Sequence, residues 1–199
     1  SWLTHSSQSI AQLSLAAPYY LPLNTIVCKA PDPMASVLGI LSKLPANQAG
    51  IVQLCLSAAP NGWANYPRGL VLQGIQTAPD KREAHPQKAL IETKISLPSL
   101  DVDIRLAGIA PDQAQADLIL SQVATAYGVY ALAGGNSLRI RKSKLSQSSK
   151  NKLIQALIAR SAEFTPPHQH LNYLEIASLY HFPNIDLTGI RNIAWGKTL

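Results

Sequence analysis

The residues most able to bind a ligand are basic, and they are concentrated in one part of the chain. Between Leu118 and Ala162 the sequence has no acidic residue, and its seven Lys and Arg residues exceed the formal net charge of +6. Such a patch favours nucleic acid, anionic lipid or an acidic protein surface as partner. The alternative is that the charges protect a solvated strand edge, since no aromatic residue for base stacking is interspersed among them. The candidate DNA- or anion-binding residues, which would contact phosphates without reading bases, are Arg139, Arg141, Lys142, Lys144, Lys150 and Lys152.

Two motifs that could bind phosphate or metal are incomplete. Gly196-Lys197-Thr198 matches the end of a phosphate-binding loop, but the glycine that such a loop needs five positions earlier is Arg191. His168 and His170 form a His-x-His pair beside two prolines, and no third ligand lies near them in the sequence. We therefore predict an exposed histidine loop, no metal and no cofactor.

Other reactive residue types favour structural roles. Asp101 and Asp103 alternate along an expected strand, which predicts solvated charges on its outer face. Cys28 and Cys55 lie in apolar, strand-like runs, which are typical of reduced and buried thiols. Hydrolase and metalloprotease motifs are absent from the sequence, so we predict that the chain is not an enzyme.

The elements that position these residues begin with a strand–helix–strand unit. Tyr20–Val27 is rich in strand formers and predicts a first strand. Asp32 and Pro33 are typical of a helix start, and apolar residues at helical spacing continue to Leu44. Ile51–Leu56 alternates as a second strand.

A second unit repeats the first. The Ala-Pro-Asp sequence recurs at Ala110–Asp112 and begins an amphipathic helix. The strand Asp101–Ile109 precedes it, with apolar side chains inward and Asp103 and Arg105 outward, and the strand Ser137–Lys142 follows it. Tandem βαβ units predict an α+β fold, a ferredoxin-like antiparallel sheet with helices on one face, plus a C-terminal helical extension.

Length and composition set the expected organisation. The 199 residues are 47% hydrophobic, enough for a packed core, and only 14% charged, which suits a piece of an assembly. The sequence contains no run of 18 apolar residues, so it predicts no membrane span. We expect an N-terminal leader segment at 1–18 and a ferredoxin-like double βαβ domain at 19–145. A long connection at 60–88 lies within that domain, and a helical extension and exit segment occupies 146–199.

The C-terminal segment Leu171–Pro183 resembles the L-x-x-E-L-A-x-L-x-H-x-P segment that precedes the motor domain in bacterial conjugation and type IV secretion ATPases. Stretches Asp32–Leu44 and Gly134–Leu138 are also similar to the N-terminal α/β module of that family. The resemblance implies an α/β module that leads through a helix into a P-loop translocase domain, and no residue here matches the nucleotide site of that domain. The motif positions that match are Glu175, Ala177, Leu179, His181 and Pro183.

We therefore expect a non-catalytic accessory or docking domain of a conjugative transfer or type IV secretion component. It would dock a cytoplasmic motor to membrane-embedded partners, or help to present DNA or a relaxase to it. Its partners would be other secretion or conjugation proteins and nucleic acid, at the cytoplasmic face of the inner membrane, with membrane contact only through partners. The alternatives are an oligomerisation module and an enzyme domain with an unrecognised site near Trp63 and Tyr66.

Overall fold

The computed structural model describes residues 6–25, 32–141, 147–161, 169–181, 187 and 189–190. The strands are β1 (Ser7–Leu15), β2 (Ala49–Ala58), β3 (Ile75–Ala78), β4 (Lys81–Glu83), β5 (Ser99–Ala110), β6 (Leu138–Ile140) and β7 (His170–Asn172). The helices are α1 (Met34–Leu41), α2 (Asn65–Gln73), α3 (Lys88–Ile95), α4 (Gln113–Ala126), α5 (Gln147–Ala159) and α6 (Tyr173–Leu179), with a 3-10 turn η2 (Tyr127–Tyr130) after α4.

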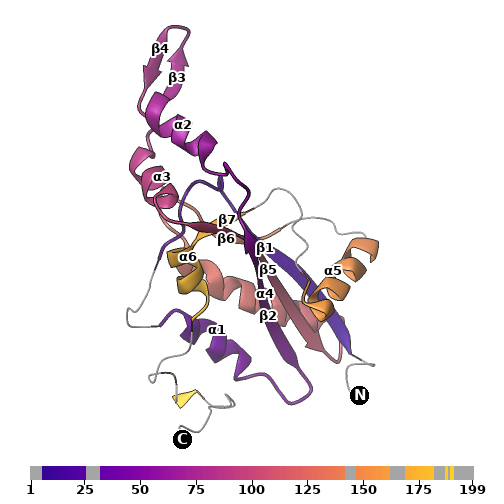
Figure 1. Cartoon of the computed structure of the whole chain (residues 1–199). Helices are drawn as coiled ribbons and strands as arrows, with labels where there is room; N and C mark the ends of the chain where they lie inside the picture. The colour runs from indigo at the N-terminus through magenta and orange to yellow at the C-terminus, as the bar shows by residue number, and fades with distance from the viewer. Residues whose placement is uncertain are drawn as a thin grey trace, which may run out of the picture.

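The main sheet is antiparallel and has the order β2–β5–β1–β6, with β7 paired to the start of β5. Two units, β1–α1–β2 and β5–α4–β6, produce this order, which is that of a ferredoxin-like fold. Helices α1 and α4 lie on one face of the sheet (Figure 1). The predicted fold class is confirmed.

The first strand lies earlier in the chain than predicted. β1 occupies Ser7–Leu15, inside the segment that the sequence assigns to a leader, and it pairs with both β5 and β6. The predicted strand Tyr20–Val27 is wrong, because residues 16–25 form turns and irregular backbone, and 26–27 lie outside the described residues. Leu21 and Leu23 are nevertheless buried, so their apolar character reflects core packing of an irregular segment.

One face of β5 and helix α4 form the main core. Val102, Ile104 and Leu106 of β5 are buried against α4, as predicted from their alternation. A Cβ at Gly108 would lie 2.3 Å from the Ala116 carbonyl oxygen, so the missing side chain lets α4 approach the strand closely.

Helix α5 covers part of the opposite face. Ile10 of β1, Ala107 of β5 and Leu153 of α5 form a second buried cluster there. In Figure 1, α5 lies on the other side of the sheet from α1 and α4. The helical extension expected at 146–199 therefore includes α5, which buries the second face of the sheet at this end.

Residues 60–98, which we call the arm, join β2 to β5 and project beyond the sheet (Figure 1). The sequence predicts only a long connection at 60–88, whereas the arm contains α2, the β3–β4 hairpin and α3. Gly74 ends α2 with a φ of 67°, and a Cβ there would lie 2.0 Å from the Glu83 carbonyl oxygen. This glycine therefore allows the hairpin to follow the helix directly.

At the other end of the chain, β7 pairs antiparallel with the first residues of β5, and α6 follows without a loop. No helix among the described residues is both long and apolar enough to cross a bilayer.

Candidate functional site

The motif segment that resembles the secretion ATPases forms a capped, buried helix start. Asn172 accepts a hydrogen bond from the Glu175 amide (3.0 Å), and Glu175 Oε2 accepts one from the Asn172 amide (2.7 Å). This reciprocal capping box has the Asn-x-x-Glu spacing that such helix starts use, so the pattern is visible in the sequence. Ala177 and Leu179 lie in the same helix, with Leu179 in the main core, and Pro183 lies outside the described residues.

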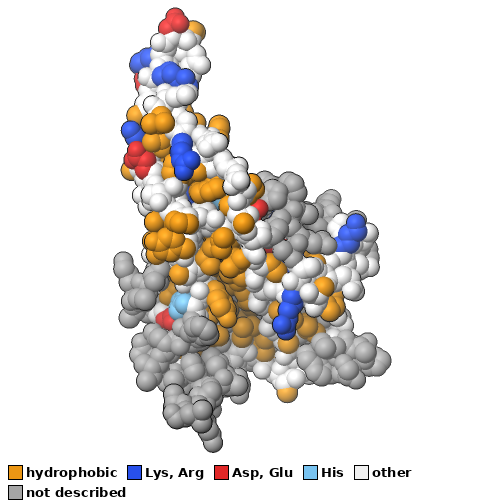
Figure 2. Space-filling model, in the orientation of Figure 1, with side chains coloured by type: hydrophobic (Ala, Val, Ile, Leu, Met, Phe, Trp, Pro, Cys, Tyr) orange, Lys and Arg blue, Asp and Glu red, His pale blue; other side chains and the backbone are white. Residues whose placement is uncertain are grey.

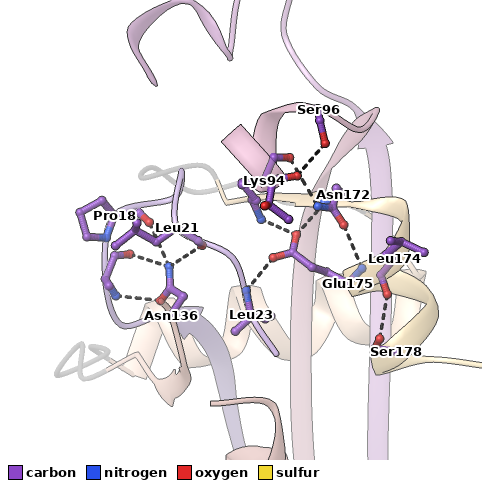
Figure 3. A network of polar contacts seen from close by, with 12 residues as sticks. Pro18, Leu21, Leu23, Lys94, Ser96, Asn136, Asn172, Leu174, Glu175 and Ser178 are labelled. Atoms are coloured by element: carbon purple, nitrogen blue, oxygen red, sulfur yellow. Dashed lines mark hydrogen bonds and ion pairs between the residues drawn. The ribbon is translucent and has the colours of Figure 1, made fainter. Parts of the chain in front are cut away.

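Glu175 also binds a lysine from the arm, as Figure 3 shows. Lys94 of α3 forms an ion pair with Glu175 Oε2, and both side chains are fully buried. The Leu23 amide donates to Glu175 Oε1 (2.8 Å), so one carboxylate joins α6, the arm and the segment after β1. Burial lowers the pKa of Lys94, and the neighbouring carboxylate acts in the opposite direction. We call Lys94, Asn172 and Glu175 the latch.

Asn136 fixes the segment after β1 from its other side (Figure 3). Its amide nitrogen donates to the carbonyl oxygens of Ala17 (3.2 Å), Pro18 (3.0 Å) and Leu21 (3.2 Å). Its Oδ1 accepts a hydrogen bond from the Ala17 amide (2.9 Å). Asn136 belongs to the Gly-Gly-Asn stretch of the resemblance, so that stretch and Glu175 hold the same segment.

His181 connects the end of α6 to the start of α1. Its Nε2 lies 3.0 Å from Asp32 Oδ1, and its Nδ1 lies 3.1 Å from the Ala177 carbonyl oxygen. Asp32 Oδ1 also accepts a hydrogen bond from the Met34 amide (2.8 Å), which is the helix-start role predicted for it. Two stretches of the resemblance that are far apart in the sequence therefore meet here.

The predicted basic residues are divided between a sheet edge and α5. Arg139 lies in edge strand β6 and Arg141 directly after it, so their side chains share the sheet face that also carries Ser14 of β1. Both arginines line two adjoining grooves of about 660 Å³ and 320 Å³, and Ser14 lines both grooves as well. The other candidates are Lys150 and Lys152, which are exposed on α5, and Lys142 and Lys144, which lie outside the described residues.

Asp103 and Arg105 are buried, although the sequence predicts solvated charges at these positions. Arg105 Nε donates to Asp103 Oδ2 (2.8 Å), and Gln12 Nε2 donates to Asp103 Oδ1 (2.9 Å). Arg105 also donates to Gln53 Oε1 (3.1 Å), and Gln53 Nε2 donates to the Leu157 carbonyl oxygen of α5 (3.0 Å). The prediction is wrong because polar side chains of β1 and β2 pair with these charges on the face that α5 partly covers.

Asp101, on the same face of β5, is also buried rather than solvated. His170 of β7 stands opposite it, and His170 Nδ1 lies 2.7 Å from Asp101 Oδ1. The predicted exposure of His170 is therefore wrong, whereas His168 lies outside the described residues. The rings of Tyr19 and Trp63 flank His170, with centroids 5.2 Å and 5.4 Å from the imidazole.

Of the two aromatic residues in the enzyme alternative, only Trp63 lies at this buried pair. The Tyr19 hydroxyl donates to the Trp63 carbonyl oxygen (3.1 Å), and burial raises the pKa of Tyr19. Tyr66 is 61% exposed on α2 and packs near Tyr20 instead. An enzyme site near Trp63 stays a prediction.

Metal ligands do not cluster in the described part of the chain, where no three His, Cys, Asp or Glu residues are grouped suitably for an ion. Cys55 is a free thiol in β2 and is half-buried rather than buried as predicted, and its partial burial raises its pKa. Cys28 lies outside the described residues.

Comparisons of the chain with protein-family models, with curated proteins and with solved structures find no match.

Proposed function

We propose that this chain is a non-catalytic docking domain of a conjugative transfer or type IV secretion component. The observation that carries the proposal is the latch, in which a motif residue, Glu175, holds the arm through Lys94 with both side chains fully buried. In the family that the motif resembles, this helix leads into the motor. A partner bound to the arm would therefore be connected rigidly to α6, and through α6 to a motor domain of the kind found in that family. The partners would be other secretion or conjugation proteins, at the cytoplasmic face of the inner membrane.

The arm offers a surface suited to a protein partner. Tyr66 is 61% and Leu72 is 83% exposed on α2, and the β3–β4 hairpin adds the exposed charges Lys81, Arg82 and Glu83. Large exposed apolar side chains beside charged ones are typical of interface centres and their polar rims.

A binding experiment with a purified P-loop translocase domain of a conjugation ATPase tests the docking proposal. We expect saturable binding by isothermal titration calorimetry, and Leu72→Lys should weaken it at least about tenfold by placing a charge in the interface. Leu56→Lys, the same change on β2, is the matched control and should leave the affinity unchanged. Binding that is equally strong in both variants, or no binding, would reject the arm as the docking surface.

A second function, contact with nucleic acid phosphates, is favoured by the convergence of Arg139 and Arg141 on two adjoining grooves. Fluorescence anisotropy with short single- and double-stranded DNA should show binding that weakens steeply with salt. The double variant R139E/R141E should lose most of the affinity. The slope of the logarithm of the affinity against the logarithm of the salt concentration should become shallower by about two, because each phosphate contact that is lost reduces this slope by about 0.9. The matched control is K81E/R82E on the hairpin, which removes the same charge. No binding at low salt would leave edge protection as the role of the basic residues.

A further inference from the structure

One of the two basic grooves has a tyrosine in its wall. The groove of about 320 Å³ at the β6 edge is lined by Arg139, Arg141 and Tyr19, among other residues. In the sequence no aromatic residue is interspersed with these arginines, but the fold brings Tyr19 to them from the segment after β1. The lining residues, all of which belong to the described part of the chain, include no acidic one. The groove therefore combines positive charge with an aromatic ring.

Tyr19 is the first ring of a row that leads out of the groove. Its ring centroid lies 5.6 Å from that of Tyr20, which in turn lies 5.9 Å from that of Tyr66 on α2. Burial, and after it the nearby Tyr66, raises the pKa of both Tyr19 and Tyr20, which places the three hydroxyl groups near one another. We call Tyr19, Tyr20 and Tyr66 the tyrosine row.

The outer end of the tyrosine row is open to solvent. Tyr66 is 61% exposed, whereas Tyr19 and Tyr20 are half-buried. Figure 2 shows hydrophobic side chains gathered at the base of the arm. An aromatic ring with this much free surface can stack on a planar group of a ligand.

The inner end of the row is held in one place. The Tyr19 hydroxyl donates a hydrogen bond to the Trp63 carbonyl oxygen (3.1 Å), and the Tyr19 ring meets the His170 ring edge-to-face at 5.2 Å. Gln169, which also lines the groove, accepts a hydrogen bond from the Leu15 amide (3.1 Å). The groove and Tyr19 are therefore preformed, so little conformational entropy is lost when a ligand binds there.

We propose that the groove and the tyrosine row bind single-stranded DNA, with phosphates at Arg139 and Arg141 and a base stacked on Tyr66. The proposal rests on the phosphate contacts proposed above and adds the form of nucleic acid that is bound. Guanidinium groups neutralise the phosphates of any DNA, whereas an aromatic ring stacks on bases that are not already paired and stacked. A duplex would first have to unstack a base, which costs free energy.

The separation of the two features favours an extended strand as the occupant. The charge lies at the groove, and the exposed ring of Tyr66 lies two ring-to-ring steps beyond Tyr19, of 5.6 Å and 5.9 Å. A ligand that reaches both must carry negative charge and planar rings along its length, as every nucleotide of a single strand does. An acidic peptide matches the arginines, but its charged side chains gain nothing from stacking on Tyr66.

Fluorescence anisotropy tests the proposal with the whole chain, a labelled oligo-dT of about 20 nucleotides and a mixed-sequence duplex of the same length. We expect the single strand to bind at least about tenfold more tightly than the duplex at the same salt concentration. Tyr66→Ala should weaken binding of the single strand at least about fivefold and leave the duplex affinity unchanged, whereas Tyr66→Phe, which keeps the ring, should bind like the unaltered chain. Tyr180→Ala removes a similarly exposed tyrosine (60%) at the end of α6, and as the matched control it should change neither affinity.

The outcomes separate this proposal from the one on which it rests. Equal affinity for both forms of DNA, or a single-strand affinity that Tyr66→Ala leaves unchanged, would overturn the role of the tyrosine row, while loss of binding in R139E/R141E would still support the phosphate contacts. No binding of either form at low salt would reject both proposals. The comparison of single strand with duplex uses the unaltered chain, so it decides the matter even if a variant misfolds.

Discussion

Replacing Glu175 by glutamine tests whether the latch holds the arm through a buried charge pair. The substitution keeps the size of the side chain and removes its charge. Lys94 then loses its carboxylate partner while it stays fully buried, and one of the amides of Leu23 and Asn172 loses its acceptor. We expect Glu175→Gln to lower the free energy of unfolding by about 3 to 5 kcal/mol at pH 7.

The upper limit of this loss follows from the chemistry of Lys94. The ordinary pKa of a lysine is 10.5, and burial already lowers it here. An unpaired Lys94 can become neutral in the folded variant, and deprotonating it at pH 7 costs about 5 kcal/mol at 1.36 kcal/mol for each pH unit. The unfolded chain then binds one more proton than the folded one. The stability of the variant should therefore rise with pH, by about 2 to 3 kcal/mol between pH 7 and pH 9.

Urea unfolding followed by circular dichroism at pH 7, 8 and 9 measures both effects. Glu92→Gln is the matched control on the same helix, since Glu92 is half exposed and lies 3.9 Å from Lys88, and it should cost less than about 0.5 kcal/mol. If Glu175→Gln does not fold at pH 7, the double variant K94M/E175Q should be more stable, because it leaves no unpaired buried ammonium. A loss below about 1 kcal/mol that is the same at pH 7 and pH 9 would refute the latch.

Two further perturbations test how the rest of the fold is held. Burial raises the pKa of Tyr127 to about 12, so the folded state keeps a proton that the unfolded chain releases above pH 10. Stability should therefore fall by about 2 to 3 kcal/mol between pH 10 and pH 12, and Tyr127→Phe should remove this part of the loss in urea unfolding. Asn136→Ala removes the side-chain hydrogen bonds to three carbonyl groups and to the Ala17 amide, and should cost about 2 to 4 kcal/mol in thermal unfolding. Asn24→Ala, which removes one 3.5 Å hydrogen bond, should cost less than about 0.5 kcal/mol.

The helix-covered face of the sheet could be predicted from the sequence because its signals are local. β5 alternates large apolar residues over several positions, and Asp112 accepts a hydrogen bond from the Gln115 amide at the start of α4. β1 could not be predicted in the same way. Its apolar residues Ile10 and Leu13 are diluted by serine, glutamine and alanine, and their burial depends on pairing with a strand that comes much later in the chain.

The buried charges could be predicted only in part, because their partners come from distant elements. The capping box of Asn172 and Glu175 is a local pattern that the sequence itself contains. The pairing of Glu175 with Lys94 spans 81 residues, and the only local signal is that Lys94 follows the buried Ile91 by one helical turn. The burial of Arg105 depends on partners from β1 and β2 and on helix α5, none of which the pattern of β5 contains.

Two of the buried carboxylates hold distant segments of the chain together. Glu175 accepts hydrogen bonds from two backbone amides and pairs with an ammonium group, and Asp103 is bound by Arg105 and Gln12. The oxygen atoms of Glu175 and Asp103 are therefore occupied by groups that fix one segment to another, which gives a single geometry. This single geometry positions the arm and the basic edge at β6, the two surfaces on which the proposed docking and phosphate contacts depend.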